Sequence, residues 1–294
     1  THTHSAPDLG SSNGNIELYK ELFQEAAIRA AQRALEDLAP ATLYGTKTEL
    51  ERMNYIRHYI MNDGTYYGSN FGSTASGFKQ HVEESDNEML LVKIDREGEN
   101  KDILLMNWQA HPCFTGGGTK KDISADYIGA VRRAIERETG MYFAFYQGAQ
   151  GNHNARSAMP DETLYKTNEV YGEKLAEYAI KELPNMKALA NTGIKSVSLR
   201  LEADVNHEDE HLQAEATEVR NLWNSTNGEN AKANALARTY GISSVYHANA
   251  ILARPGRPLK ADMELNAVYV GGLAFITAPI EMFRGTGEYI KANS

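Results

Sequence analysis

The sequence predicts an α/β fold in which helices flank a mixed β-sheet and a site forms at the carboxyl ends of the strands. Two observations carry this prediction. Short apolar runs typical of strands alternate with longer segments whose apolar residues recur at helical spacing. Polar clusters also follow the ends of three predicted strands. In α/β sheets, ligands bind outside the carboxyl ends of the strands, so these clusters are the candidate site.

The first half of the chain begins with a predicted amphipathic helix at residues 16–38, which Asn15 caps and Pro40 ends. Residues 53–72 are aromatic and irregular, and they indicate a loop that lines a site. Ser124 is expected to cap the helix at 125–138, and Gly140 to end it. The strands predicted in this half are 90–94, 103–108 and 142–146, with a turn at 95–100 between the first two.

The second half continues the alternation. A helix that carries Tyr171, Leu175 and Tyr178 on one face is expected to end at Pro184. Its other predicted elements are a half-buried strand at 197–201, helices at 208–224 and 229–240 separated by Gly228, and a near-continuous apolar strand at 268–278 ended by Pro279. The apolar character of that last strand on both faces predicts a central position in the sheet.

Composition excludes several classes of protein. The 294 residues carry 30 Lys and Arg against 39 Asp and Glu, a net charge of −9, which argues against a nucleic-acid binder. The 41% hydrophobic content is enough for a sizeable core. No apolar run approaches the roughly 20 residues of a membrane helix. Cys113 is the only cysteine, so an intrachain disulfide is excluded.

The three polar clusters are His111-Pro112, residues 148–154 and Glu281. Two imidazoles and one carboxylate form a ligand set of catalytic zinc, so His2, His111 and Glu281 are a candidate metal set. On spacing alone, a hydrogen-bonded histidine at a strand end and a surface carboxylate are the favoured interpretation of His111 and Glu281. His4 shares a face with His2 if the segment is extended, and it would then reach a substrate or a metal ligand.

The loop at 148–154 is small and polar. Its glycines would let backbone N–H groups approach a substrate oxyanion, although a tight turn alone would use them equally well. A separate alternative starts from Thr1, which would act as an N-terminal nucleophile activated by its own α-amine.

Five motifs together resemble one known family. They are, in order, residues 2–7 (HTHSAP), 107–112 (NWQAHP), 123–129 (ISADYIG), 147–154 (QGAQGNHN) and 278–281 (APIE). This order resembles the catalytic domain of neutral/alkaline (non-lysosomal) ceramidases. The resemblance spans nearly the whole chain.

The resemblance implies a zinc-dependent amidohydrolase that cleaves the N-acyl bond of ceramide-like amides by metal-activated water. It implies that His2, His111 and Glu281 bind zinc and that His4 lies in the active site. It further implies that Arg57 contributes to the pocket.

The sequence departs from the family pattern at the catalytic loop. Asn154 stands where the family has an active-site Ser, and Asn152 where it has an Asp, so both are candidate oxyanion donors. The family's Tyr zinc ligand has no clear counterpart, because Tyr289 lies in a different local context. The first strands and the C-terminal immunoglobulin-like domain of the family are also absent, so we expect 1–294 to be one incomplete catalytic domain.

The resulting functional expectation is a zinc hydrolase of a lipid N-acyl amide. The alternatives are a ceramidase-like binding protein without hydrolysis and a zinc hydrolase of a non-lipid amide or ester. We expect no nucleic-acid partner, peripheral membrane contact only through the substrate, and flanking segments or a second chain that complete the fold. By resemblance, the protein would be secreted, periplasmic or at the cell surface.

Overall fold

The computed structural model describes residues 2–7, 9, 16–67, 77–116, 123–157, 159, 163–190 and 193–294. The chain divides into two compact units that alternate along the sequence. Unit 1 comprises Thr1–Glu51, Asn87–Gly148 and Tyr165–Ala190, and unit 2 comprises Arg52–Asp86, Ala149–Leu164 and Asn191–Ser294.

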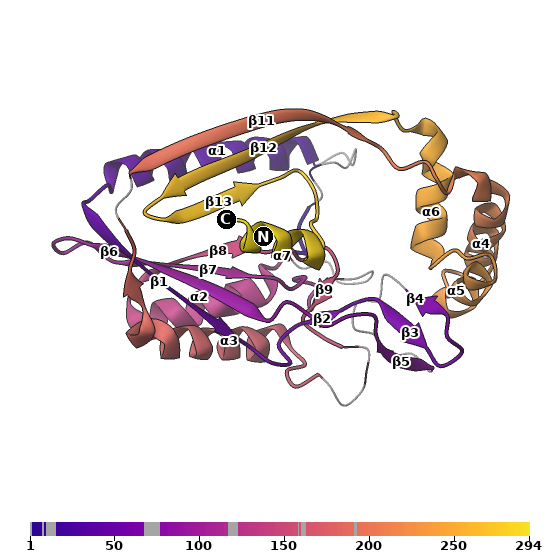
Figure 1. The fold of residues 1–294 in the computed structure, drawn as a ribbon, viewed down its shortest axis with the longest axis horizontal. Helices are drawn as coiled ribbons and strands as arrows, with labels where there is room; N and C mark the ends of the chain where they lie inside the picture. The colour runs from indigo at the N-terminus through magenta and orange to yellow at the C-terminus, as the bar shows by residue number, and fades with distance from the viewer. Residues whose placement is uncertain are drawn as a thin grey trace. The chain divides into compact units, whose positions relative to one another are not determined.

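Unit 1 is built on a five-stranded mixed sheet with the order β10-β1-β6-β7-β8, in which β7 and β8 are parallel and the other neighbours antiparallel (Figure 1). Its elements are α1 (Ile16–Glu36), β1 (Ala41–Glu49), β6 (Glu88–Arg96), β7 (Ile103–Trp108), α2 (Asp126–Thr139), β8 (Tyr142–Gln147), α3 (Asn168–Glu182), the 3₁₀ turn η1 (Leu183–Asn185) and β10 (Lys187–Ala188). The mixed sheet flanked by helices confirms the predicted fold class.

The core of unit 1 lies between the sheet and the helix pair α2 and α3. Alternate residues of β7 are buried, as expected for a strand with one covered face. The last of them, Trp108, donates a hydrogen bond from its indole N–H to the hydroxyl of Tyr171 on α3, at 2.9 Å. Tyr127 on α2 donates to the carbonyl of Ala110, at 2.8 Å. These bonds hold both helices against the end of β7 and the residues that follow it.

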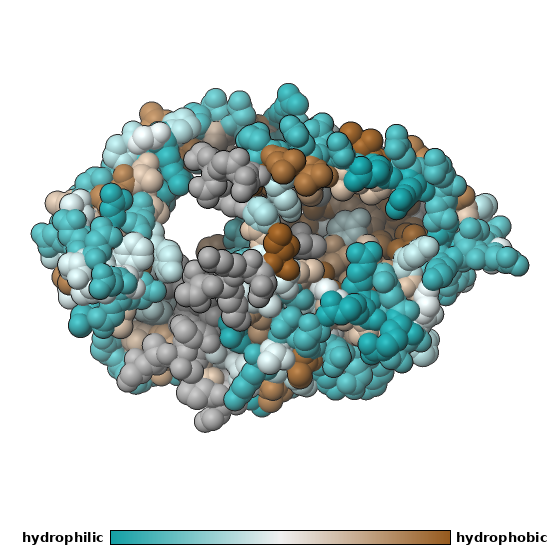
Figure 2. Space-filling model, turned by 180° about the vertical axis from the view of Figure 1, so that it is seen from behind, coloured by the Kyte–Doolittle hydropathy of each residue, from teal (hydrophilic) through white to brown (hydrophobic). Residues whose placement is uncertain are grey.

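Helix α1 differs from the buried amphipathic helix that the spacing predicts. It forms within the expected range and ends at Glu36, but only Ile16 among its residues is buried. Leu18, Leu22 and Leu35 are each more than half exposed. Figure 2 shows apolar side chains among hydrophilic ones on the surface. No described helix is long and apolar enough to cross a membrane.

Unit 2 contains three small sheets and a helical cluster. Its elements are β2 (Tyr55–Ile56), β3 (Tyr59–Met61), β4 (Tyr66–Tyr67), β5 (Phe78–His81), β9 (His153–Asn154), β11 (Ile194–Asp204), the 3₁₀ turn η2 (Glu210–Leu212), α4 (Gln213–Ser225), α5 (Asn230–Thr239), α6 (Val245–Ala253), the 3₁₀ turn η3 (Arg254–Gly256), β12 (Lys260–Val270), β13 (Leu273–Thr277) and α7 (Arg284–Ala292). The sheets have the orders β11-β12-β13, β2-β9 and β4-β3-β5.

A separate apolar cluster holds α4, α5 and α6 together. Its fully buried residues are Ala216, Val219, Ala233, Ala237, Ile242, Val245, Ala248 and Ile251. Half of these residues are alanines, whose small side chains allow the three helices to pack closely.

The prediction of one continuous central strand at 268–278 is wrong. Gly271 and Gly272 both have positive φ, of 58° and 81°, and they turn the chain between β12 and β13. The two strands pair as an antiparallel hairpin, and β13 is an edge strand. A turn of two left-handed residues strongly favours glycine, so the Gly-Gly pair outweighs the apolar run around it.

Most other predicted elements are confirmed, with shifted ends. The strands β6, β7 and β8 and the helices α2, α3, α4 and α5 lie where the sequence places them. Gly140 ends α2 in the left-handed conformation, with φ of 73°. The predicted irregular segment at 53–72 instead contains β2, β3 and β4 in its described part, residues 53–67. The predicted cap Asn15 lies outside the described residues.

Candidate metal and active site

Three histidines of unit 1 converge on one point. One ring nitrogen from each of His2, His4 and His111 lies within 4.8 Å of the others, and this is the group among the described residues that could hold a metal ion. The ring centroids are 5.1 to 5.4 Å apart, and the His111 ring meets the other two edge to face. His111 is buried, with 1% of its surface exposed, whereas His2 and His4 are exposed. The cluster therefore has an anchored side and an open side.

The position of His111 follows from the sheet. β7 and β8 run parallel in register from Ile103 opposite Tyr142 to Trp108 opposite Gln147. Their carboxyl ends therefore lie at the same edge, as the sequence analysis requires for the first two polar clusters. The third cluster does not share this sheet, because the strand before Glu281 belongs to the β11-β12-β13 sheet of unit 2.

The segment that carries His2 and His4 is fixed by backbone hydrogen bonds. The His4 N–H donates to the carbonyl of Pro112 at 3.1 Å, and the Ser124 N–H donates to the carbonyl of Ser5 at 2.9 Å. Gly116 packs directly against His4: a Cβ added at Gly116 would lie 2.4 Å from the His4 Cβ. His2 itself has a positive φ of 57°, an uncommon conformation for a residue with a side chain.

The other predicted site residues gather in unit 2. The Arg57 N–H donates to the carbonyl of Asn152 at 2.9 Å, and β2 pairs with β9, which contains Asn154. The Gly151 N–H donates to the carbonyl of Met282 at 2.7 Å, which places the 148–154 loop beside the segment that contains Glu281. A Cβ on Gly151 would lie 2.6 Å from the Glu281 carbonyl oxygen, so this close approach requires glycine.

Asn152 serves as a bridge within unit 2. Its side-chain N–H₂ donates to Glu83 at 3.0 Å, and its side-chain oxygen accepts from the Arg284 N–H at 2.8 Å. Arg284 also forms an ion pair with Glu83 at 3.0 Å. Because the Asn152 oxygen and one amide hydrogen are already used, this residue fastens the 148–154 loop to the start of α7. Its predicted role as an oxyanion donor stays a prediction.

His153, between the two asparagines, is a structural histidine. It is fully buried, its Nε2 accepts from the Asp86 N–H at 3.0 Å, and its Nδ1 lies 2.9 Å from the Ala149 carbonyl. Burial lowers the pKa of His153 to about 4. The neutral imidazole therefore accepts with Nε2 and donates with Nδ1. The two hydrogen bonds of His153 fix the backbone beside Asn154, which is the next residue and is also buried.

His58, next to Arg57, packs between aromatic rings of unit 2. Its ring centroid is 5.5 Å from that of Tyr66 and 5.6 Å from that of Phe283. Burial, with the nearby Arg57 charge, lowers the pKa of His58 to about 4.

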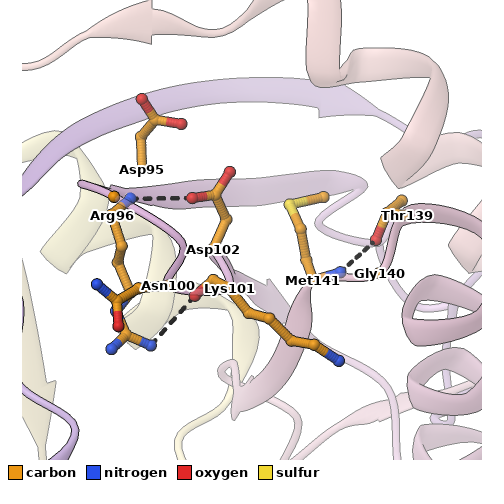
Figure 3. A pocket seen from close by; sticks show the side chains of 9 residues that line it. Asp95, Arg96, Asn100, Lys101, Asp102, Thr139, Gly140 and Met141 are labelled. Atoms are coloured by element: carbon orange, nitrogen blue, oxygen red, sulfur yellow. Dashed lines mark hydrogen bonds between the residues drawn. The ribbon is translucent and has the colours of Figure 1, made fainter.

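A shallow pocket of about 380 Å³ in unit 1 contains none of the predicted site residues. It lies at the starts of β7 and β8, the opposite end of those strands from His111. Figure 3 shows the Arg96 side chain reaching the Lys101 carbonyl, at 3.1 Å, and the Arg96 N–H donating to Asp102, at 2.9 Å. These groups stabilise the β6–β7 turn, so we assign the pocket no function.

Sequence reasoning missed the residues that hold the predicted ones. Glu83 and Arg284 secure Asn152, and Thr115 and Asp126 support the segment with His4. Asp126 lies in the motif ISADYIG at 123–129, which was the one available signal. Glu281 stays a predicted metal ligand, and Thr1 lies outside the described residues.

Comparison with known proteins relates this geometry to one fold. No family model matches the sequence, and no curated protein matches it either. The structure is similar to neutral ceramidase from Pseudomonas aeruginosa, with a TM-score of 0.56 and 15% sequence identity over 99% of this chain and 50% of that one. A structure described as ceramidase complexed with C2 matches with a TM-score of 0.39 and 16% identity, over 60% of this chain and 28% of that one.

The first of these similarities confirms the ceramidase-like fold that the five motifs indicate. The chain spans about half the length of the Pseudomonas aeruginosa protein.

Proposed function

We propose that this protein is a zinc-dependent amidohydrolase that cleaves an N-acyl, ceramide-like amide. The observation that carries the proposal is the convergence of His2, His4 and His111 on a fold similar to that of neutral ceramidase. Imidazole nitrogens are preferred zinc ligands, and three of them form a catalytic zinc site in other enzymes. Divergence at 15% identity leaves the exact substrate to experiment.

The donor set fits zinc. Nitrogens that share one tetrahedral zinc at the usual bond lengths lie about 3.3 Å apart. The three nitrogens lie within 4.8 Å of one another, so modest side-chain rotations would close the set.

Zinc bound here would supply a Lewis acid that lowers the pKa of water and polarises a carbonyl group. The chain's own residues would hold the metal and leave it accessible to the substrate. Buried His111 holds the site in place, while exposed His2 and His4 leave one side open to solvent and substrate. His4 would either complete the ligand set or, as the motif resemblance implies, move a proton at the substrate.

The proposed roles of the unit 2 residues rest on the motif resemblance. Arg57 would bind the polar part of the substrate, and Asn154 would donate a hydrogen bond to the developing oxyanion. An asparagine side chain cannot replace the family serine as a nucleophile, so the reaction would not pass through an acyl-enzyme at this position. Glu281 is the proposed carboxylate ligand.

The proposed substrate class is a lipid N-acyl amide, which the protein would meet as a secreted or surface-exposed enzyme in peripheral contact with membranes. The deciding experiment is metal analysis of the purified protein, paired with an amidase assay on N-acyl lipids and N-acyl amino acids, with and without a chelator. We expect one zinc per chain and chelator-sensitive release of fatty acid from the lipids. Zinc without turnover would favour the binding protein, and the absence of zinc binding would refute the proposal.

The ligand set can be resolved by two substitutions. His4→Ala and Glu281→Gln are compared for zinc affinity by competition with a chromophoric chelator. If only Glu281→Gln weakens zinc binding, the set is His2, His111 and Glu281, and His4 acts on the substrate. If only His4→Ala weakens it, the three histidines are the ligands.

A further inference from the structure

Asp126 is a buried residue with hydrogen bonds to Thr115, Ser124 and Tyr127. It is 2% exposed and opens α2 with a positive φ of 52°. Of the described residues other than glycine, four have positive φ, and two of them are His2 and Asp126. Residues with a side chain adopt this conformation rarely, and such strain clusters at functional sites. The surroundings of Asp126 must therefore favour a conformation that its backbone does not.

The Asp126 carboxylate collects three hydrogen bonds. One oxygen accepts from both the N–H and the hydroxyl of Thr115, each at 2.8 Å. The other oxygen accepts from the Tyr127 N–H at 2.7 Å. Its own N–H donates to the Ser124 hydroxyl at 3.0 Å. Asp126 thus binds the loop that follows β7, the same loop that carries His111 four residues earlier.

A chain of hydroxyl groups extends from this carboxylate to the neighbour of His4. The single hydroxyl hydrogen of Thr115 is donated to Asp126, so its oxygen is left to accept from the Ser5 hydroxyl, at 2.9 Å. The Thr3 hydroxyl donates to the Ser124 carbonyl at 2.8 Å. Three segments therefore meet through Asp126: residues 2–7 with His2 and His4, residues 111–116 with His111, and the start of α2.

A carboxylate at the start of a helix is common because it complements the helix dipole. That explanation accounts for the bond to Tyr127, which lies in the helix. It does not account for the bonds to Thr115, which lies outside α2 and passes the interaction on to Ser5. Nor does it require burial or a left-handed backbone, since surface Asp residues serve the same purpose.

We propose that Asp126 is a positioning residue that, through Thr115 and Ser5, holds the segment with His2 and His4 against the loop with His111. This inference rests on the proposed function, because the converged imidazoles are its metal site. The carboxylate fixes the three rings in place before metal binds. Groups that hydrogen-bond directly to metal ligands change metal affinity by about 10- to 100-fold in other proteins. Asp126 acts through two hydroxyl groups, so we expect an effect at the lower end of that range.

The first test compares Asp126→Asn with Asp102→Asn. Asp102 is a matched control because its carboxylate also accepts a backbone N–H, from Arg96 at 2.9 Å, but at the other end of β7. We expect Asp126→Asn to weaken zinc binding by roughly 10-fold, the lower end of the range for direct partners of metal ligands, and to change the visible spectrum of the Co²⁺-loaded protein. Asp102→Asn should leave both unchanged. Equal zinc affinities for the two variants would overturn the inference.

The second test requires neither a folded Asp126 variant nor bound zinc. Thr115→Val removes the hydroxyl at nearly constant shape, whereas Thr115→Ser retains it. Hydrogen exchange in the metal-free protein should accelerate at residues 2–7 in Thr115→Val and stay near the wild-type rate in Thr115→Ser. Indistinguishable exchange in the two variants would refute the positioning role. If the wild type binds no zinc but this difference appears, the proposed function fails while the positioning role of the hydroxyl chain stands.

Discussion

The candidate site residues of the two units differ in what surrounds their polar groups. In unit 1, one ring nitrogen from each of His2, His4 and His111 lies within 4.8 Å of the others. In unit 2, the Asn152 amide points at Glu83 and Arg284, which are structural partners. Closeness to other predicted site residues is therefore weaker evidence for function than a set of donors whose chemistry and spacing suit a ligand. Three imidazole nitrogens at this spacing suit a metal ion, whereas the hydrogen bonds of the Asn152 side chain join elements of the fold.

The largest effect that would test this contrast is the loss of a converged imidazole. His111→Ala removes the buried ring of the cluster, and we expect zinc binding and turnover both to be abolished. His211→Ala is the control, because His211 is exposed in unit 2 and its Nδ1 lies 2.9 Å from the nearby Glu208 carbonyl. Zinc content and fatty-acid release are measured for both. Retained zinc in His111→Ala would show that the convergence has no role in metal binding.

The buried histidine of unit 2 predicts a pH effect on stability. The pKa of His153 falls from 6.5 to about 4 on folding, so between these values the unfolded chain binds a proton that the native protein does not. The contribution of neutral His153 to the free energy of unfolding is fully present above pH 6.5 and is lost as the pH falls toward 4. It amounts to about 3 kcal/mol.

This prediction is checked by urea unfolding of the wild type and His153→Gln at pH 7 and pH 4. The wild type should lose about 3 kcal/mol more than the variant over this range. His58 also titrates near pH 4, but it is present in both proteins and cancels in the difference. Equal losses would mean that His153 is not held neutral.

The close approach in unit 2 predicts an intermediate effect. In Gly151→Ala, the new Cβ would lie 2.5 Å from the Phe283 ring and 2.6 Å from the Glu281 carbonyl oxygen. The backbone must shift, and overpacking of this kind lowers the free energy of unfolding by about 1–3 kcal/mol. Gly256→Ala is the control, because nothing lies within 4 Å of its added Cβ. Unfolding midpoints in urea compare the two, and similar midpoints would contradict the packing described.

The smallest expected effect comes from Asn154. Asn154→Ala removes one proposed oxyanion donor while the zinc ligands stay in place, so we expect turnover to fall roughly tenfold, about 1.4 kcal/mol in activation free energy. Zinc content should not change. Steady-state kinetics on the best N-acyl substrate measures the effect. A loss as severe as that of His111→Ala, with zinc retained, would assign Asn154 a larger role than oxyanion binding.

Sequence patterns predicted most of unit 1, because its core elements follow simple periodicities. A short apolar run identifies β7, and Gly140 identifies the end of α2. The same reasoning failed at 268–278, because a Gly-Gly turn inside an apolar run looks like a continuous strand. It also expected α1 to bury its apolar side chains, which periodicity alone cannot decide, since burial depends on a covering surface.

The candidate site was predicted only in part. The motif residues were predicted, whereas the residues that support them through long-range hydrogen bonds were not. The ordered motifs placed His2, His4 and His111 in one site, and the structure brings them together. The supporting contacts of Asp126 join residues 11 positions apart through Thr115, and those of Asn152 join residues 69 and 132 positions apart. Hydrogen bonds of such range follow no local period, so a single sequence does not reveal them.

The parallel pair β7 and β8 also offers a place for attaching probes. A six-residue strand is about 20 Å long, so the turn before β7 and the histidines after it lie at opposite ends of one rigid element. Gly98 forms that turn with a positive φ of 75°, and Asn100 closes it by donating to the Glu97 carbonyl at 2.7 Å. A fluorophore attached at residues 98–100 would thus label the protein without adding a competing ligand near the imidazoles. A surface linker at the same residues would immobilise it in the same way.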